Sequence, residues 1–320
     1  MTRTPAFPLA LAALPALLVC APLRAQDGPG TEGALVFQLS SAPRAVALGD
    51  AYAALSGPLA LFHNPAGLAG APSSAVLAYQ TLPAGASAGL AGVVFRLGPG
   101  RLGVGLQFLD YGSIDEVTPD PTGVLGVPTG ATVSGGEAAA SLAYGLGLGP
   151  LWLGAAARAL RVDIADVSDA TTAFDAGVAA HFLDRRFTVA GALQNLGGEV
   201  RAGRPAPLPL TARLGMAVRV QSTADRRGVL AFELTSRRSQ LDGPAPVNAG
   251  VGVELAGRWK EAWLVVRGGY RQRVGSGDAG SGLAVGGGVR LGGWLLDYAY
   301  QPLGPLGATH HLGLTYSPGS

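Results

Sequence analysis

The 320-residue chain is apolar yet poor in charge, with 48% hydrophobic residues, 14% charged residues and a formal net charge of +2. The charged fraction is well below the roughly 25% of a soluble domain, and the small net charge without basic runs gives no reason to expect a nucleic-acid partner. After the first 25 residues, no segment reaches the roughly 18 unbroken apolar residues of a membrane helix. This combination is typical of barrel strands, in which only every second residue meets lipid.

Residues 1–25 are predicted to be a signal peptide. Arg3 provides the positive start, residues 9–19 form an apolar stretch, and Ala25 offers a small residue for cleavage before Gln26. The only cysteine, Cys20, follows Val19, whereas a lipoprotein signal requires a small residue there. We therefore expect a mature chain without lipidation, disulfides or thiolate metal ligands.

Residues 26–73 do not alternate in polarity and are predicted to form a plug with short helices inside a barrel. The segment 42–55 is rich in alanine and leucine, and Asn64-Pro65 follows it. Proline suits the first turn of a helix, and asparagine before it can cap that turn. A barrel of about 14 strands leaves an interior that such a segment can fill.

Residues 74–316 are predicted to form an all-β fold, a transmembrane antiparallel β-barrel of about 14 strands, with a C-terminal tail over 317–320. The predicted strands cover 74–81, 87–97, 101–110, 135–147, 150–163, 173–183, 186–196, 209–221, 228–238, 247–258, 262–272, 281–291, 293–300 and 308–316. Connections after even-numbered strands are short, whereas the others are mostly longer, above all 111–134, 163–172, 196–208 and 239–246. Sorted loops of this kind indicate a bacterial outer-membrane barrel with short turns on the periplasmic side.

Charged and small residues share one face of the predicted strands, which we assign to the lumen. This face carries Arg213, Arg219, Glu233, Glu254, Arg267 and Asp297. We expect plug residues Arg44, Asp50 and Asn64 to meet these side chains. The four tryptophans, Trp152, Trp259, Trp263 and Trp294, fall near the short turns, where an aromatic girdle is expected.

Catalytic, metal-binding and cofactor-binding patterns are weak, and we expect none of these sites and no enzyme. His310 and His311 are adjacent in a predicted strand and therefore point to opposite faces. Asp163, Asp166 and Asp169 lack the glycine turn and bidentate glutamate of a calcium loop. No Ser/His/acid set has a distinguishing spacing.

Several motifs resemble the PorV/PorQ family of outer-membrane proteins, relatives of the FadL long-chain fatty acid transporters. The N-terminal motif consists of Arg44, Gly49, Tyr52, Asn64, Pro65, Ala66, Gly67 and Leu68, and later motifs cover 193–197, 208–215, 264–270, 296–300 and 306–310. The chain departs from the family at Asp50, where a second glycine is usual, and at His63, where an aromatic is usual. These departures bear on inherited ligand or partner contacts rather than on the fold.

Three functions remain open at this point. The resemblance implies a docking or attachment barrel of the type IX secretion apparatus, with secreted cargo or secretion-machinery proteins as partners besides outer-membrane lipid. A FadL-like channel for a hydrophobic small molecule is the first alternative, and a secreted soluble β-repeat protein is the second. A channel requires an apolar lumen, whereas the predicted inward face is small and charged, which slightly favours docking.

Overall fold

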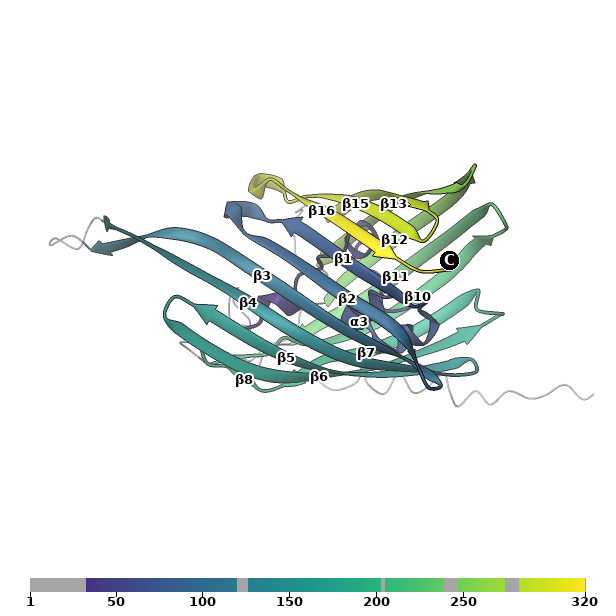
Figure 1. Cartoon of the computed structure of the whole chain (residues 1–320), viewed down its shortest axis with the longest axis horizontal. Coiled ribbons are helices and arrows are strands. Elements are labelled where there is room, and N and C mark those ends of the chain that lie inside the picture. Colours follow the sequence, from purple (N-terminus) through teal and green to yellow (C-terminus); the bar gives the residue numbers. More distant parts are fainter. Residues whose placement is uncertain (1–32, 120–125, 203–204, 239–246, 274–281, 320) are drawn as a thin grey trace, which may run out of the picture.

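The computed structural model describes residues 33–119, 126–202, 205–238, 247–273 and 282–319. Fourteen antiparallel strands close into a barrel, each beside its neighbour in the chain (Figure 1). The strands are β1 (Ser74–Thr81), β2 (Ser87–Leu97), β3 (Gly100–Pro119), β4 (Gly126–Leu148), β5 (Leu151–Ile164), β6 (Val167–Phe182), β7 (Phe187–Gly197), β10 (Leu210–Ser222), β11 (Arg226–Arg238), β12 (Val247–Trp259), β13 (Ala262–Arg273), β14 (Leu283–Leu291), β15 (Trp294–Pro302) and β16 (Ala308–Tyr316). The predicted fold class is therefore confirmed, while the predicted signal peptide lies outside the described residues.

The outer face of the barrel is apolar, as the alternation predicts. In β10, Met216 is 39% exposed, whereas its neighbour Ala217 is 6% exposed and faces the lumen. Met216 pairs across the strands with Phe232, which also points outward. Among the described residues, no helix is long and apolar enough to cross a membrane. A closed barrel with an apolar outer band places the protein in the bacterial outer membrane.

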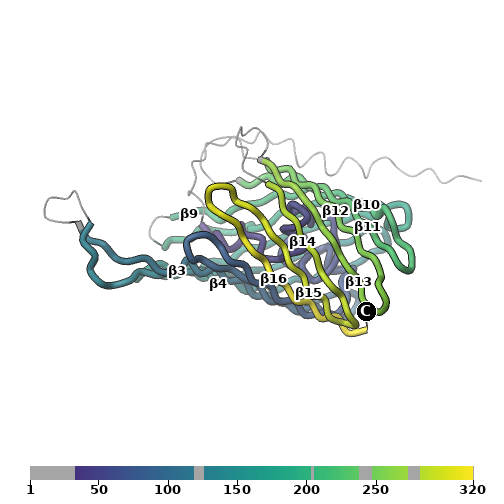
Figure 2. The backbone as a smooth tube through the Cα atoms, turned by 90° about the horizontal axis from the view of Figure 1, so that it is seen from above, coloured from purple at the N-terminus to yellow at the C-terminus, as the bar shows by residue number. Residues whose placement is uncertain are grey.

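The predicted loop 111–134 is wrong, because β3 and β4 continue through most of it as a long arm. Their ladder runs on from Ser113 opposite Ser134 to Thr118 opposite Val127, with two register shifts on the way. Figure 2 shows this arm extending beyond the barrel. Its β-branched residues, among them Ile114, Val117 and Val127, favour a strand, which the glycine and proline content of the segment obscured.

The predicted loop 163–172 is also wrong, because β5 and β6 meet in a tight turn. Only Ala165 and Asp166 separate the two strands, and Ala165 adopts a left-handed φ of 50°. The predicted loop 196–208 holds a small separate sheet of β8 (Glu199–Val200) and β9 (Ala206–Pro207). The predicted loop 239–246 lies outside the described residues.

Residues 33–73 run through the barrel interior, where most of their side chains are buried. Four short helices form along this plug, namely η2 (Leu35–Phe37), α2 (Pro43–Ala47), α3 (Ala60–His63) and η3 (Pro65–Gly70). Figure 2 shows the plug inside the ring of strands. As the sequence predicts, η3 begins at Pro65, and the Asn64 side chain accepts a hydrogen bond from the Ala66 amide at 3.1 Å.

A row of three wall glycines lets the plug lie directly against the barrel. Gly145, Gly154 and Gly177 are paired across β4, β5 and β6. A Cβ at Gly145 would lie 2.8 Å from Leu68 Cβ, and a Cβ at Gly154 would overlap the backbone of Pro65 and Ala66. The absence of a side chain at these wall positions therefore creates the seat of η3.

Two of the four tryptophans do not join an aromatic girdle. Trp152 is only 5% exposed, and its ring meets that of His181 edge-on at 4.0 Å inside the barrel. Trp263 lies beside Arg227 on the luminal face. Trp259 and Trp294 are 62% and 53% exposed, as the girdle prediction requires. The prediction was wrong for Trp152 because both faces of β5 carry apolar residues, so periodicity does not separate them.

Leu214→Arg is expected to destabilise the barrel by about 2–4 kcal/mol, because Leu214 shares the lipid face of β10 near its middle. Val220→Arg, near the periplasmic end of the same strand, is expected to cost about 0–1 kcal/mol. Both values are measured by urea unfolding and refolding in lipid vesicles. Equal costs at the two depths would contradict the assignment of this face.

Candidate functional site: the plug and its luminal wall

Two wall carboxylates hold backbone amides of the plug. Glu233 of β11 is 1% exposed, and its Oε2 accepts hydrogen bonds from the amides of Tyr52 at 2.9 Å and Ala53 at 2.7 Å. Glu137 of β4 accepts from the amides of Leu35 at 3.1 Å and Val36 at 2.7 Å. Charged acceptors make the stronger class of hydrogen bond, so the wall fixes the plug at two separate places.

A chain of alternating charges joins α2 to the wall. Arg44 makes a bidentate contact with Glu254, through Nε at 2.7 Å and Nη2 at 2.9 Å. The same carboxylate accepts from Arg267 Nε at 2.6 Å, and Arg267 also donates to Asp297 at 2.6 Å. The two cations and two anions balance, so this buried network has no surplus charge.

Arg213 connects Glu233 of the wall to helix α3 of the plug. Its Nη1 lies 2.6 Å from Glu233 Oε1, and its Nε donates to Gln194 at 2.6 Å. Gln194 in turn donates to the Phe62 carbonyl at 3.1 Å. Deeper in the wall, Arg158 pairs with Asp175 at 2.6 Å, and both side chains are at most 2% exposed.

The N-terminal motif is built around close backbone approaches. Gly49 has a φ of 64°, and a Cβ there would lie 2.6 Å from the Tyr270 carbonyl oxygen. Asp50 also adopts a left-handed φ of 61°, and its carboxylate pairs with Arg271. Asp50, which stands where the PorV/PorQ motif usually has a second glycine, therefore keeps a glycine-like backbone and adds an ion pair. Asn64 donates to the Ala53 carbonyl at 2.8 Å and so connects two parts of the plug.

The structure brings most of the predicted site residues together. One network consists of Arg44, Glu254, Arg267 and Asp297. A second network consists of Tyr52, Arg213 and Glu233. The turn that lies on the glycine row consists of Asn64, Pro65, Ala66, Gly67 and Leu68. Arg219 is exposed beside a bulge in β10 and joins neither network. The predicted site residues did not include Glu137, Arg158, Asp175 or Arg271. All four lie within predicted strands, and the alternation already places Asp175 on the luminal face of its strand and could have placed the other three there as well.

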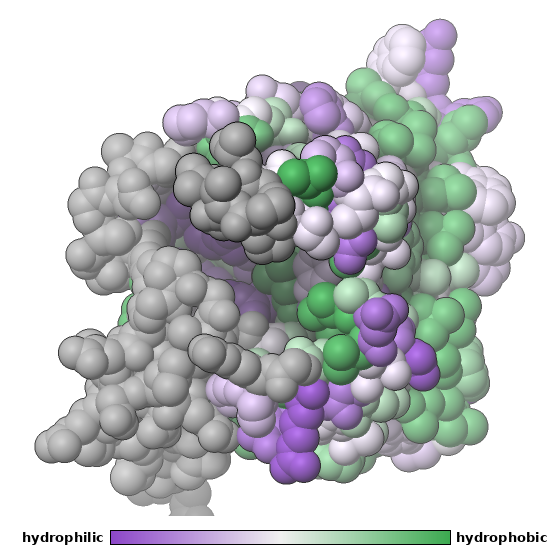
Figure 3. Space-filling model, turned by 90° about the vertical axis from the view of Figure 1, so that its left-hand side faces the viewer, coloured by the Kyte–Doolittle hydropathy of each residue, from purple (hydrophilic) through white to green (hydrophobic). Residues whose placement is uncertain are grey.

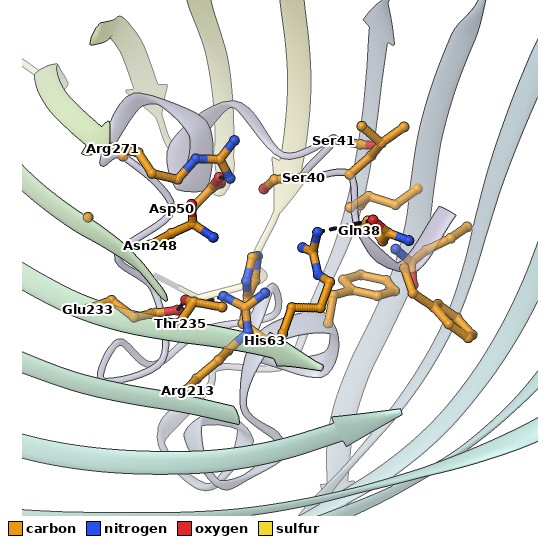
Figure 4. A pocket seen from close by; sticks show the side chains of 18 residues that line it. Gln38, Ser40, Ser41, Asp50, His63, Arg213, Glu233, Thr235, Asn248 and Arg271 are labelled. Carbon is orange, nitrogen blue, oxygen red and sulfur yellow. Dashed lines mark hydrogen bonds and ion pairs between the residues drawn. The ribbon is translucent and has the colours of Figure 1, made fainter. Parts of the chain in front are cut away.

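A cavity of about 40 Å³ remains between the plug, strands β10 to β13, and Leu90 and Gln107 of β2 and β3. Figure 4 shows polar side chains converging on it, including Gln38, Asp50, His63, Arg213 and Arg271. The cavity is large enough for only one or two water molecules. This volume is far below the roughly 300 Å³ of the smallest typical small-molecule sites, so the cavity has no room for an organic ligand in this position of the plug.

The opposite side of the extracellular half is apolar. There the plug residues Val36, Phe37 and Leu39 pack against a patch that we call the apolar wall, which consists of Ala88, Leu109, Ala139, Leu160, Val162 and Ala173 of β2 to β6. Figure 3 looks into this end and shows hydrophobic and hydrophilic surfaces side by side within the hollow. The apolar wall thus lies beside the buried charges Glu137, Arg158 and Asp175 on the same strands.

His63 makes plug docking sensitive to acid. Burial, and the Arg213 cation in second place, lower the pKa of His63 to about 3, although Asp50 raises it. Its Nδ1 has no hydrogen-bond partner among the described residues. Because an undocked His63 titrates near 6.5, protons bind the undocked plug more strongly between pH 6.5 and 3, and docking weakens as the pH falls.

Hydrogen–deuterium exchange of plug amides, corrected for the intrinsic rate at each pH, is expected to rise as the pH falls from 6.5 to 4. The expected slope is at most about 1.4 kcal/mol per pH unit. His63→Phe should reduce this slope, because the ring contact with Tyr52 at 4.9 Å can be kept without a titrating group. An unchanged slope in His63→Phe would assign the effect to other groups at the plug.

No protein-family model and no curated protein sequence matches the chain. Among solved structures, it is similar to the Pseudomonas putida toluene transporter TodX, with 13% identity and a TM-score of 0.54 over 92% of this chain and 98% of that one. A TodX deltaS2S3 mutant, described as a monoaromatic hydrocarbon channel, gives a TM-score of 0.56 with 13% identity over 86% and 96% of the two chains. The predicted PorV/PorQ membership has no matching family model to support it. The chain shares the fold of the TodX channels, a 14-stranded barrel of the bacterial outer membrane.

Proposed function

We propose that this barrel carries hydrophobic small molecules across the outer membrane and that the plug is its gate. The observation that carries the proposal is the apolar wall in the extracellular half of the lumen, covered by Val36, Phe37 and Leu39. This patch limits the earlier objection that the inward face is small and charged, because β2 to β6 also carry a buried apolar surface beside Glu137 and the Arg158–Asp175 pair. The shared fold with a toluene transporter also supports a channel for hydrophobic molecules.

We expect the plug to move for passage, because the described cavity beside it, at about 40 Å³, is far smaller than a small-molecule site. A hydrophobic ligand entering from outside would replace the contacts of Phe37 and Leu39 with the apolar wall. The amides of Leu35 and Val36 would then leave Glu137, which is the anchor nearest to the apolar wall. The charged network around Glu254 lies on the other side of the lumen and holds the rest of the plug in place.

Uptake of 1-N-phenylnaphthylamine by intact cells tests the transport. Cells that produce the protein are expected to take up this hydrophobic dye several-fold faster than cells without it. Equal rates in the two strains would reject the channel.

A disulfide lock tests the gate separately. A Cβ at residue 33 would lie 3.4 Å from Ala206 Cβ, close to the roughly 3.8 Å of a disulfide. Gly33→Cys with Ala206→Cys is expected to block dye uptake when oxidised and to restore it after reduction, whereas Ala206→Cys alone should stay open. Uptake that is equal in the oxidised and reduced double variant would reject movement of this end of the plug.

Protein docking is a second candidate, favoured by the β3–β4 arm alone. The arm carries exposed apolar side chains beyond the barrel, with Ile114 at 70% and Val117 at 57% exposure. A photo-crosslinking amino acid at Val117 in living cells should capture a secreted or surface protein if the arm docks one. If deletion of the arm leaves dye uptake unchanged, transport does not depend on the arm, and docking and transport are separate functions.

A further inference from the structure

The periplasmic end of the barrel is strongly basic. Among the described residues, its rim and last luminal positions carry the basic side chains Arg96, Arg101, Arg185, Arg186, Arg219, Arg226, Arg227, Arg258, Lys260 and Arg290, against the acidic side chains Asp184, Asp225 and Glu261. This surplus of seven positive charges exceeds the net charge of +2 for the whole chain. Positive charge is thus concentrated at one end, where it raises the local concentration of anions.

Part of this charge lines a cavity that opens at the periplasmic end. The cavity, which we call the vestibule, has a volume of about 350 Å³ and is lined by Arg227, Arg258, Glu261, Trp263, Arg290 and Gly292. These residues lie where β11, β12, β13 and β14 end. The Arg227 guanidinium stacks on the Trp263 ring, with 4.4 Å between its central carbon and the ring centroid. Stacking fixes the plane of the guanidinium and leaves its edge able to donate.

The vestibule differs from the lumen above it in its charge balance. Deeper in the barrel, Arg44, Arg158, Arg213 and Arg267 each pair with a carboxylate. Arg227 and Arg258 form no ion pair with any described residue, and Arg258 only donates to the Lys260 carbonyl at 3.3 Å. Carboxylates inside the barrel therefore neutralise the deeper arginines, whereas Arg227 and Arg258 remain available to a ligand.

We propose that the vestibule binds a phosphate monoester group that reaches it from the periplasm. Arg227 and Arg258, which pair with no described carboxylate, bring two guanidinium groups to the vestibule, and these match the charge of about −2 on a phosphate monoester better than the single charge of a carboxylate. A guanidinium edge fits two phosphate oxygens at once. The volume lies at the lower end of small-molecule pockets, so a small organic group can accompany the phosphate. This site is independent of the proposed passage of hydrophobic molecules.

Two sources can deliver the same group, a soluble phosphate ester or the headgroup of a lipid in the inner leaflet. Isothermal titration of the full mature protein in a non-ionic detergent distinguishes them with two probes, glycerol 3-phosphate and dodecyl phosphate. Binding of both probes with similar affinity supports a soluble ligand, whereas binding of dodecyl phosphate alone supports a lipid. Binding of neither probe at low salt overturns the site.

The double variant Arg227→Gln and Arg258→Gln is expected to weaken binding at least ten-fold. Both side chains are exposed, so the barrel should still fold, which heat-modified migration on a gel would verify. The matched control is Arg161→Gln with Arg201→Gln, two exposed arginines at the extracellular end. Equal affinity in the two double variants would overturn the proposal.

Discussion

Replacing Glu233 with glutamine is expected to release the plug from its central anchor. The substitution keeps the shape of the side chain but removes the charge that Arg213 pairs with at 2.6 Å. Breaking one partner of a buried ion pair costs about 3–5 kcal/mol, because the other charge stays buried without compensation. The hydrogen bonds to the Tyr52 and Ala53 amides also lose their charged acceptor. We therefore expect a large shift toward the undocked plug.

Thiol labelling of a reporter cysteine measures this shift. Ser41 is 5% exposed in the plug, and Ser41→Cys is almost isosteric, while the only other cysteine, Cys20, lies in the predicted signal peptide. Labelling by a water-soluble maleimide is expected to accelerate by at least about 100-fold in the Glu233→Gln background, as about 3 kcal/mol corresponds to two decades.

A second ion pair provides the control for Glu233. Glu199 pairs with Arg201 at 2.8 Å, but their side chains are 38% and 71% exposed. Exposed pairs of this kind contribute about 0–1 kcal/mol, so Glu199→Gln should leave reporter labelling nearly unchanged. Similar labelling in the two variants would show that Glu233 does not anchor the plug.

Gly154→Val is expected to expel the Asn64–Leu68 turn from its seat. A Cβ at this position would overlap the backbone of Pro65 and Ala66, and backbone atoms cannot yield as the end of a flexible side chain can. Gly154 lies within β5 and is not among the residues with positive φ. Valine should therefore be compatible with the strand itself, so the effect falls on the plug rather than on the barrel.

Overpacking of this kind costs about 1–3 kcal/mol or more, so reporter labelling at Ser41→Cys should rise by at least about five-fold. Gly268→Val is the matched control, since a Cβ at Gly268 in β13 would meet nothing within 4 Å. The barrel should fold in both variants, as judged by heat-modified migration. If the Ser41→Cys reporter stays protected from labelling in Gly154→Val, the Asn64–Leu68 turn does not lie against Gly154 in solution.

The alternation of polar and apolar residues was sufficient to predict the barrel and to predict which face of most strands lines the lumen. The predicted bounds of β1, β2 and β16 agree with the structure to the residue, because their alternation is regular and their turns contain glycine or proline. The alternation failed in β5, where Leu151 and Leu153 face outward while Trp152 and Leu160 face inward. When both faces are apolar, only the position of the plug decides which of them is the lumen.

Local chemistry also determined the start of η3, since a capping asparagine and a proline act within a few residues of each other. The plug anchors required the tertiary structure. Glu137 meets Leu35 across 102 residues, and Arg44 meets Glu254 across 210. A charged residue on an inward face can pair with any luminal partner at its depth, and depth depends on the register of the closed barrel. The sequence thus determined the membrane, the barrel and the existence of a plug, whereas closure of the barrel decided which wall residues hold the plug and where the lumen is apolar.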